Sequence, residues 1–338
     1  MAIKKFKRLL LSYVAGIGLT ISLTFLFLEY GWAAPMDGAL FSMSLGASVI
    51  VLLFFFHIIQ HFGLPKDGMN FAFLPHFERH WRLFAISYCY TLGVNIPNIL
   101  IWQGEWGVSV AGTYRFAPVY DVVTFYAFLS ILPLMTMFVV SVETTFYERY
   151  VDYFTFITKK GNFREIDDAR KDLLHTLWFE LRHMIEYQLV FTLVFLALGN
   201  YILSGAGITY NQVNMYNVLL FAAFFTGVLQ LIYILLIYFD CQEDVLQISG
   251  LFLVCNFVFG LVGLLWLGNT SYGFTFFLAT GASLFYGLTR LSRFGKRINY
   301  FVFCGQPVFY QPPHGILTRL AQRLYGDRLV DMERGDKE

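Results

Sequence analysis

Two pairs of histidines have a spacing that suits metal binding. His57 and His61, and likewise His76 and His80, are four residues apart, which places both imidazoles of a pair on one helical face. Some membrane enzymes hold iron with histidines arranged in this way. Such sites need more ligands in closer groups, and histidines in loops or at a membrane interface explain the pattern as well. An iron-dependent membrane enzyme is therefore the weakest of the functions considered.

A polar stripe follows one helical face between residues 91 and 102. Asn95, Asn98 and Trp102 share this face, and Pro97 interrupts the backbone hydrogen bonding between the two asparagines. A kinked membrane helix with a polar face is typical of a substrate pathway between two lobes of a transporter. Asparagines also form hydrogen bonds between membrane helices, so the same stripe fits a structural role equally well.

Carboxylates flank the apolar segment 122–142. Asp121 precedes it, and Glu143 and Glu148 follow it. Carboxylates at both mouths of a membrane helix could guide a cationic or polyhydroxylated substrate, because ionisable groups are costly to keep at a membrane. Charges at the ends of an ordinary helix account for these positions too.

The loop before Asp121 combines aromatic rings with charges. It contains Glu105, Trp106 and Arg115. Sugars stack on aromatic rings, so contacts with a polysaccharide are expected first around Trp106, Arg115 and Asp121. A belt of aromatic residues at the membrane interface explains the rings as well.

Signatures of covalent catalysis are missing from the sequence. There is no glycine-rich nucleotide loop, no nucleophile paired with a base, and no aspartate cluster of the kind that glycosyltransferases use. We therefore expect no enzymatic activity and no cofactor. A formal net charge of +1 gives no reason to expect a nucleic-acid partner either.

The elements that position these residues are membrane helices. Hydrophobic residues make up 57% of the chain and charged residues 14%, and the mean hydropathy is +0.58. A soluble fold cannot bury so large an apolar surface, so the bilayer must be the solvent. Eight apolar segments are long enough to cross it: 9–28, 39–59, 81–102, 122–142, 188–204, 217–238, 246–267 and 272–291. We predict an all-α polytopic membrane bundle of eight transmembrane helices.

The distribution of basic residues predicts the orientation of these helices. The chain has 24 Lys and Arg residues, and Arg115 alone lies on one side of the eight segments. Loops rich in Lys and Arg stay in the cytoplasm. Both termini are therefore expected to be cytoplasmic.

The longest loop, 143–187, carries helix signals. Gly161 is suited to end one helix, and Asn162 with Glu165 forms a capping box for the next. Apolar residues then recur at helical spacing, at Leu173, Leu177, Leu181 and Met184. These features predict an amphipathic helix at the cytoplasmic interface that runs into the fifth span.

The tail after residue 291 is basic. Within it, residues 316–330 are weakly amphipathic and contain Arg319, Arg323 and Arg328. This stretch could lie on anionic lipid, bind a partner, or remain solvated and simply hold the orientation of the last helix.

Several short stretches resemble the integral membrane subunit of Pel exopolysaccharide export, the PelG type, a polysaccharide-transporter branch of the MATE/MOP flippase superfamily. The matching stretches are YD at 120–121, LSILP at 129–133, VET at 142–144, FYE at 146–148, YFD at 238–240, GLFLVCN at 250–256 and YGF at 272–274. Their order and spacing over several spans make the resemblance specific, although none of them is diagnostic of a chemistry.

The resemblance implies a two-lobed bundle of six plus six helices that moves a polymer across the bacterial inner membrane. Its implied partners are a cytoplasmic glycosyltransferase, a cyclic-di-GMP receptor, membrane lipid and the polysaccharide itself. The Pel polymer contains amino sugars and has cationic character. This makes Asp121, Glu143 and Glu148 more attractive as residues of a pathway.

The chain departs from the family pattern in two places. First, it starts where the fifth helix of the family would lie. The resemblance then divides the chain into four parts: a two-helix remnant of the first lobe (1–62), a cytoplasmic linker (63–80), a six-helix second lobe (81–291) with the amphipathic loop 143–187, and a basic tail (292–338). A separate N-terminal half or a second copy would complete the bundle, unless the chain is a fragment. The turn from Asp240 to Asp244 is acidic where relatives are commonly basic.

The sequence supports three functions in descending order. The first is a transport subunit for an exopolysaccharide that works without its own catalysis. The second is a membrane scaffold, in which the loop 143–187 and the tail recruit the synthesis machinery. The third is the histidine-based membrane enzyme.

Overall fold

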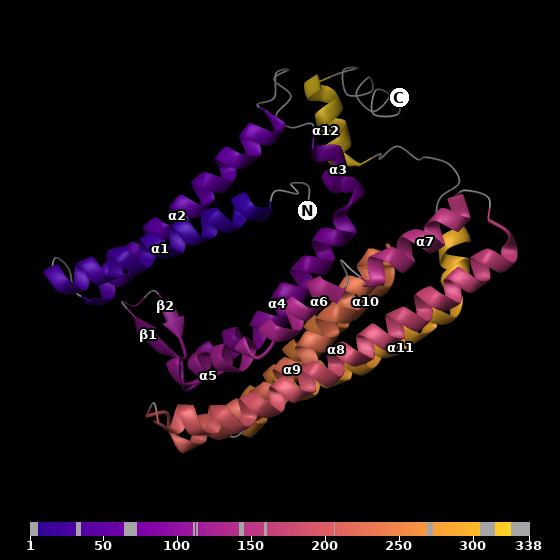
Figure 1. The fold of residues 1–338 in the computed structure, drawn as a ribbon. Helices are drawn as coiled ribbons and strands as arrows, with labels where there is room; N and C mark the ends of the chain where they lie inside the picture. The colour runs from indigo at the N-terminus through magenta and orange to yellow at the C-terminus, as the bar shows by residue number, and fades with distance from the viewer. Residues whose placement is uncertain are drawn as a thin grey trace. The chain divides into compact units, whose positions relative to one another are not determined.

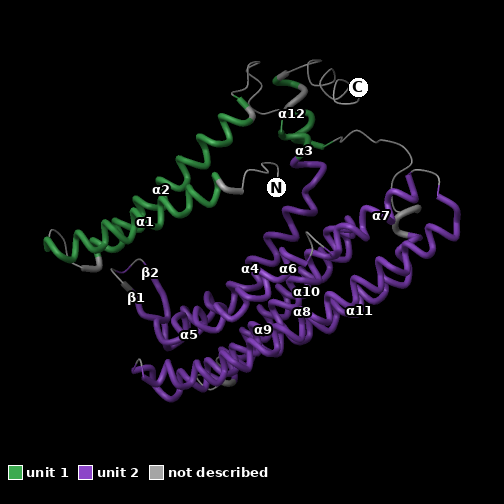
Figure 2. Tube along the Cα trace, in the orientation of Figure 1, with its two compact units in different colours: residues 1–76, 314–338 green, residues 77–313 purple. Residues whose placement is uncertain are grey.

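A computed structural model describes residues 6–31, 35–63, 73–110, 112, 114–141, 145–158, 161–205, 207–268, 273–304 and 315–325. These residues form helices joined by turns, together with one antiparallel hairpin of two short strands (Figure 1). The chain divides into two compact units, residues 1–76 with 314–338, and residues 77–313 (Figure 2).

The first unit contains a hairpin of two long helices, α1 (Phe6–Tyr30) and α2 (Pro35–Phe62). The helices meet at glycines: a Cβ on Gly16 would lie 2.2 Å from Ile50, and one on Gly46 only 1.9 Å from the Thr20 hydroxyl oxygen. Such close backbone approach is common between membrane helices. Most other side chains of the pair are exposed, and only 11% of the most apolar stretch of each helix is buried. This unit also contains α12 (Ile316–Tyr325), and α3 (Leu74–Arg79) lies at its boundary with the second unit.

The second unit is a larger helical bundle. Its elements are α4 (Trp81–Gln103), β1 (Val108–Val110), β2 (Tyr114–Phe116), α5 (Pro118–Leu129), α6 (Leu132–Ser141), α7 (Tyr147–Thr158), α8 (Phe163–Gly205), α9 (Tyr210–Tyr238), α10 (Gln242–Val262), a π-helical turn η2 (Gly263–Leu267) and α11 (Phe274–Cys304).

Helix α9 is the centre of this bundle. It packs against α5, α8, α10 and α11, and 67% of its most apolar stretch is buried, far more than in α1 or α2. Leu219, Leu229 and Ile232 are fully buried. Helix α4 packs against α10, and Gly93 of α4 leaves room for Phe252, because a Cβ at that position would come within 2.5 Å of the ring.

Seven of the described helical segments are long and apolar enough to cross a membrane, compared with the eight predicted spans. The remaining prediction, 272–291, overlaps α11 from Phe274 onward, and this helix is not among the seven. Its apolar character is diluted by Arg290 and by polar residues such as Thr280 and Ser283, which are buried among neighbouring helices. Inward-facing polar groups lower the hydropathy of a segment without exposing it to lipid.

The fourth predicted span is two helices rather than one. Helix α5 ends before Ser130 and α6 begins at Leu132, immediately before Pro133, which has no N–H to continue the ladder. The side-chain amide of Gln188 on α8 donates a hydrogen bond to the Ser130 carbonyl at 3.0 Å. The Ser130 carbonyl at the break between α5 and α6 therefore has a side-chain donor from α8. Helix α4, in contrast, continues through Pro97.

Helix α8 begins where the sequence predicts. The Asn162 N–H donates to the Glu165 carboxylate at 2.7 Å, and the Gly161 N–H bonds the Phe156 carbonyl. The amphipathic half and the fifth predicted span form one helix of 43 residues. The predicted apolar positions of the amphipathic half are buried against protein: Leu173, Leu177, Leu181 and Met184. Helix α8 packs on α7, and Leu174 and Trp178 come close to Gly295 of α11.

Candidate functional site

An open pocket of about 400 Å³ lies between α4 and α5. Its lining combines apolar and polar side chains: Val94, Asn98, Trp102, Asp121, Thr124, Phe125 and Phe128. Three of the residues predicted to line a pathway, Asn98, Trp102 and Asp121, thus come together in one place. We call this site the α4–α5 pocket.

The Asp121 carboxylate is the most strongly held group in the pocket. The Trp102 indole N–H donates to both of its oxygens, at 3.0 Å each, and the backbone N–H of Ala117 donates to one of them at 2.9 Å. Ala117 is the residue that precedes α5, so Asp121 caps that helix from within its first turn. The carboxylate therefore also fixes the start of α5 to the last turn of α4.

This arrangement can bind a polar molecule with apolar faces. Asp121 keeps lone pairs for hydroxyl or ammonium donors, and Asn98 offers both an acceptor and donors. The rings of Trp102, Phe125 and Phe128 provide flat apolar surfaces beside these groups. A sugar presents the same combination of C–H faces and hydroxyl groups.

Arg115 and Trp106 lie near the start of α5 but do not line the pocket. Arg115 sits on β2, paired in register with Ser109 of β1, and its guanidinium donates to the Gln103 side-chain oxygen at 2.7 Å. Trp106 packs partly buried against the core. Arg115, the one basic residue on its predicted side of the membrane, is thus bonded to Gln103 at the end of α4.

The remaining predicted site residues are not part of the pocket. Asn95 is exposed, and its amide donates to the Thr91 carbonyl of its own helix at 2.8 Å. Glu148 lies exposed in the first turn of α7. Glu143 is outside the described residues. The polar stripe predicted on α4 is therefore divided, with Asn98 and Trp102 in the pocket and Asn95 apart from it.

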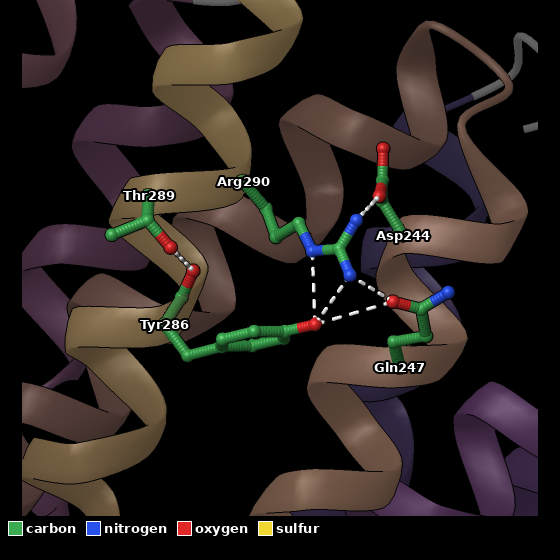
Figure 3. Close-up of polar contacts among 5 residues, drawn as sticks. All are labelled: Asp244, Gln247, Tyr286, Thr289 and Arg290. Atoms are coloured by element: carbon green, nitrogen blue, oxygen red, sulfur yellow. Dashed lines mark hydrogen bonds and ion pairs between the residues drawn. The ribbon is translucent and has the colours of Figure 1, made fainter.

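A second polar site, which the sequence analysis did not predict, joins α10 to α11. Arg290 of α11 forms an ion pair with Asp244 of α10 at 2.9 Å, and their side chains are only 22% and 16% exposed. Tyr286 and Gln247 complete the group: the Tyr286 hydroxyl accepts from Arg290 at 2.9 Å and donates to Gln247 at 3.2 Å (Figure 3). Arg290 also donates to the Gln247 side-chain oxygen. We call these four residues the Arg290 cluster.

The same turn of α10 forms a second ion pair. Glu243 pairs with Arg82 in the first turn of α4 at 2.9 Å, with both side chains well exposed, at 72% and 44%. The first turn of α10 thus holds one arginine from α4 and one from α11. This explains the acidic turn: both carboxylates lie at a helix N-terminus, where negative charge is favourable, and each has a basic partner.

Close to this turn the chain is tightly packed. Phe146 and Tyr150 contact Tyr238 and Phe239, with ring centroids 4.7 to 5.9 Å apart. Burial, followed by the nearby Asp244 and Asp240 carboxylates, raises the pKa of the Cys241 thiol to about 12. This cysteine is therefore a protonated packing residue at neutral pH rather than a nucleophile.

The histidine pairs do not gain further ligands. Within the part of the chain that the structure describes, no three His, Cys, Asp or Glu side chains lie close enough to hold a metal ion. His57 and His61 are on α2, and His76 belongs to the short helix α3, with His80 just after its end.

Comparison with known proteins gives one match. Residues 1–303 match the model of a family described as "PelG: Putative exopolysaccharide Exporter (EPS-E)". No curated protein and no solved structure is significantly similar to the chain.

Proposed function

The chain belongs to the PelG family of exopolysaccharide exporters, and we propose that it moves an amino-sugar exopolysaccharide of the Pel kind across the inner membrane of a bacterium. The observation that carries this proposal is the family match over residues 1–303, nearly the whole chain. The seven candidate membrane helices agree with it, because an exporter must line a route across the bilayer.

The proposed topology has eight spans and cytoplasmic termini. Helix α11 is included as the eighth span because it packs extensively on α9 and α10, both of which are candidate spans. The Arg290 cluster then lies at the cytoplasmic end and the α4–α5 pocket at the opposite end. Arg82 and Trp102 mark these two ends of α4, about 30 Å apart along the helix at 1.5 Å per residue. The sidedness of Lys and Arg supports this orientation.

We assign contact with the exported polymer to the α4–α5 pocket. Asn98 and Asp121 would bind hydroxyl or ammonium groups of the sugars, while Trp102 and Phe125 provide stacking surfaces. Arg115 and Trp106 would contact the polymer beyond the pocket, and Glu143 and Glu148 would contact it nearer the cytoplasmic end. A carboxylate suits a polymer with cationic amino groups because opposite charges attract strongly near a membrane.

Movement of the polymer requires the cytoplasmic end to open. The two ion pairs of the first turn of α10 tie α4 and α11 to that helix, whereas the pocket at the other end is open. We propose that separation of these pairs accompanies an inward-open state, whose population the partners then control. A cytoplasmic glycosyltransferase and a cyclic-di-GMP receptor are the proposed partners.

The test is export by cells that depend on this chain. We expect Asn98→Ala and Trp102→Phe to lower secreted polymer by about tenfold, which corresponds to 1.4 kcal/mol of lost binding. Asn95→Ala, one helical turn away and exposed, is the matched control and should export normally. The amount of each variant in the membrane is measured in parallel. Normal export by both pocket variants would exclude the pocket as a polymer contact.

A scaffold is the second candidate, favoured by the charged first turns of α8. Asp167 pairs with Arg170 and with Lys171 there, on a surface remote from the pocket. If this surface recruits the glycosyltransferase, reversing the charges of Arg170 and Lys171 should abolish both co-purification and export. Pocket variants should then export normally.

A further inference from the structure

Helix α12 carries an apolar stripe that nothing in the chain covers among the described residues. Ile316, Leu320 and Leu324 recur every four residues and are all exposed. Residues at this spacing share one face of a helix. Leaving three aliphatic side chains in water along one face is unfavourable, because their apolar surface stays hydrated.

Basic residues border the stripe. Arg319 and Arg323 are exposed and lie along one edge of it, and α12 contains no acidic residue. The opposite face is the one that packs within the unit, because Thr318 is buried there. Arginines beside an apolar face are typical of helices that lie flat at a membrane surface, where the aliphatic stems stay in the apolar zone and the guanidinium groups reach the phosphates.

We propose that α12 lies in the interface of an anionic membrane leaflet. Ile316, Leu320 and Leu324 would enter the boundary of the acyl chains, and Arg319 and Arg323 would contact lipid phosphates. Two observations select lipid: the charge of the helix is complementary to anionic headgroups, and the bilayer is always within reach of a chain with seven candidate spans. That this is the cytoplasmic leaflet rests on the proposed topology. The insertion itself does not depend on the proposed function.

The test uses the full-length protein in nanodiscs that hold a single copy each. An environment-sensitive fluorescent amino acid replaces Leu320 in one variant and Thr318 in a second. The discs contain phosphatidylcholine alone or with phosphatidylglycerol, and a fraction of lipids carries bromine on the acyl chain as a quencher. We expect brominated lipid to quench the label at 320 by roughly twofold or more, with stronger quenching in the anionic discs, and to leave the label at 318 unchanged.

Charge reversal separates headgroup binding from apolar insertion. Arg319→Glu combined with Arg323→Glu should remove the extra quenching in anionic discs and change little in neutral ones. Two results would overturn the proposal. One is a label at 320 that aqueous iodide quenches and brominated lipid does not. The other is a label shielded from both quenchers, which would show that protein covers the stripe instead.

Discussion

The two ends of the unit formed by residues 77–313 are held together in different ways. At the α4–α5 pocket, one carboxylate and one indole join two helices and leave an open space of about 400 Å³ beside them. At the other end, the Arg290 cluster and the Arg82–Glu243 ion pair together join three helices, and aromatic rings fill the neighbouring space. Substitutions at the pocket should therefore change binding more than stability. Substitutions at the cluster should change stability and the balance between conformations.

The largest loss of stability is expected from Arg290→Ala. It leaves Asp244 largely buried without its partner, so we expect a loss of roughly 2 to 3 kcal/mol in the free energy of unfolding, measured in mixed detergent micelles. Arg293→Ala, exposed one turn later on the same helix, is the control. The double variant Asp244→Asn with Arg290→Gln should recover part of the loss. Equal losses for Arg290 and Arg293 would contradict a special role for the cluster.

The next largest effect is expected midway between the two ends, at the break between α5 and α6. Gln188→Leu leaves the Ser130 carbonyl buried without its side-chain donor, at a cost of about 2 kcal/mol. Thr226→Val is the control. Its buried hydroxyl donates to the Ala222 carbonyl of its own helix, and the shape is preserved. Unfolding of the two variants under the same conditions checks the difference, and similar stabilities would mean that Gln188 does not support the break.

At the pocket, Asp121→Asn should affect export more than stability. An amide replaces one acceptor oxygen with a donor, so one of the N–H groups of Trp102 and Ala117 loses its bond, and the pocket loses its charge. We expect about tenfold less secreted polymer, equivalent to 1.4 kcal/mol. Glu105→Gln removes a charge from the preceding loop without touching the pocket lining and should export normally. Export by Asp121→Asn at the level of this control would contradict a role of the Asp121 carboxylate in binding the polymer.

The smallest effect is expected for Arg82→Gln. Its pair with Glu243 has the same 2.9 Å distance as the Arg290 pair, but both side chains are well exposed. Exposed pairs contribute about 1 kcal/mol or less. Comparison of the Arg82 and Arg290 variants therefore shows how burial changes the contribution of an ion pair to stability. If Arg82→Gln loses as much free energy of unfolding as Arg290→Ala, exposure does not distinguish the two ion pairs.

Local signals in the sequence predict much of this fold. The apolar segments mark the helices, and Asn162 and Glu165 mark the start of α8. Each of these depends on residues a few positions apart. The spacing of Asn98 and Trp102 likewise places them together on α4, next to Asp121 at the start of α5.

Other features depend on partners far apart in the sequence. Asp244 and Arg290 are 46 residues apart, and Gln188 and Ser130 are 58 apart. No periodicity relates such positions, so the acidic turn from Asp240 to Asp244 does not reveal its arginine partners in the sequence. Helical spacing also groups Asn95 with Asn98, but only Asn98 lines the α4–α5 pocket with residues of α5.

The glycine contact between α1 and α2 has a consequence for the order in which the protein is made. The two helices contact each other through residues close in sequence, at Gly16 and Gly46, and little else covers them. Contacts between nearby residues form early, and the N-terminal part of a chain is synthesised first. We expect this hairpin to pair in the membrane while most of the chain is still unmade. Cysteine pairs across α1 and α2 should therefore cross-link in nascent chains that are long enough for α2 to leave the ribosome but that lack most of the second unit.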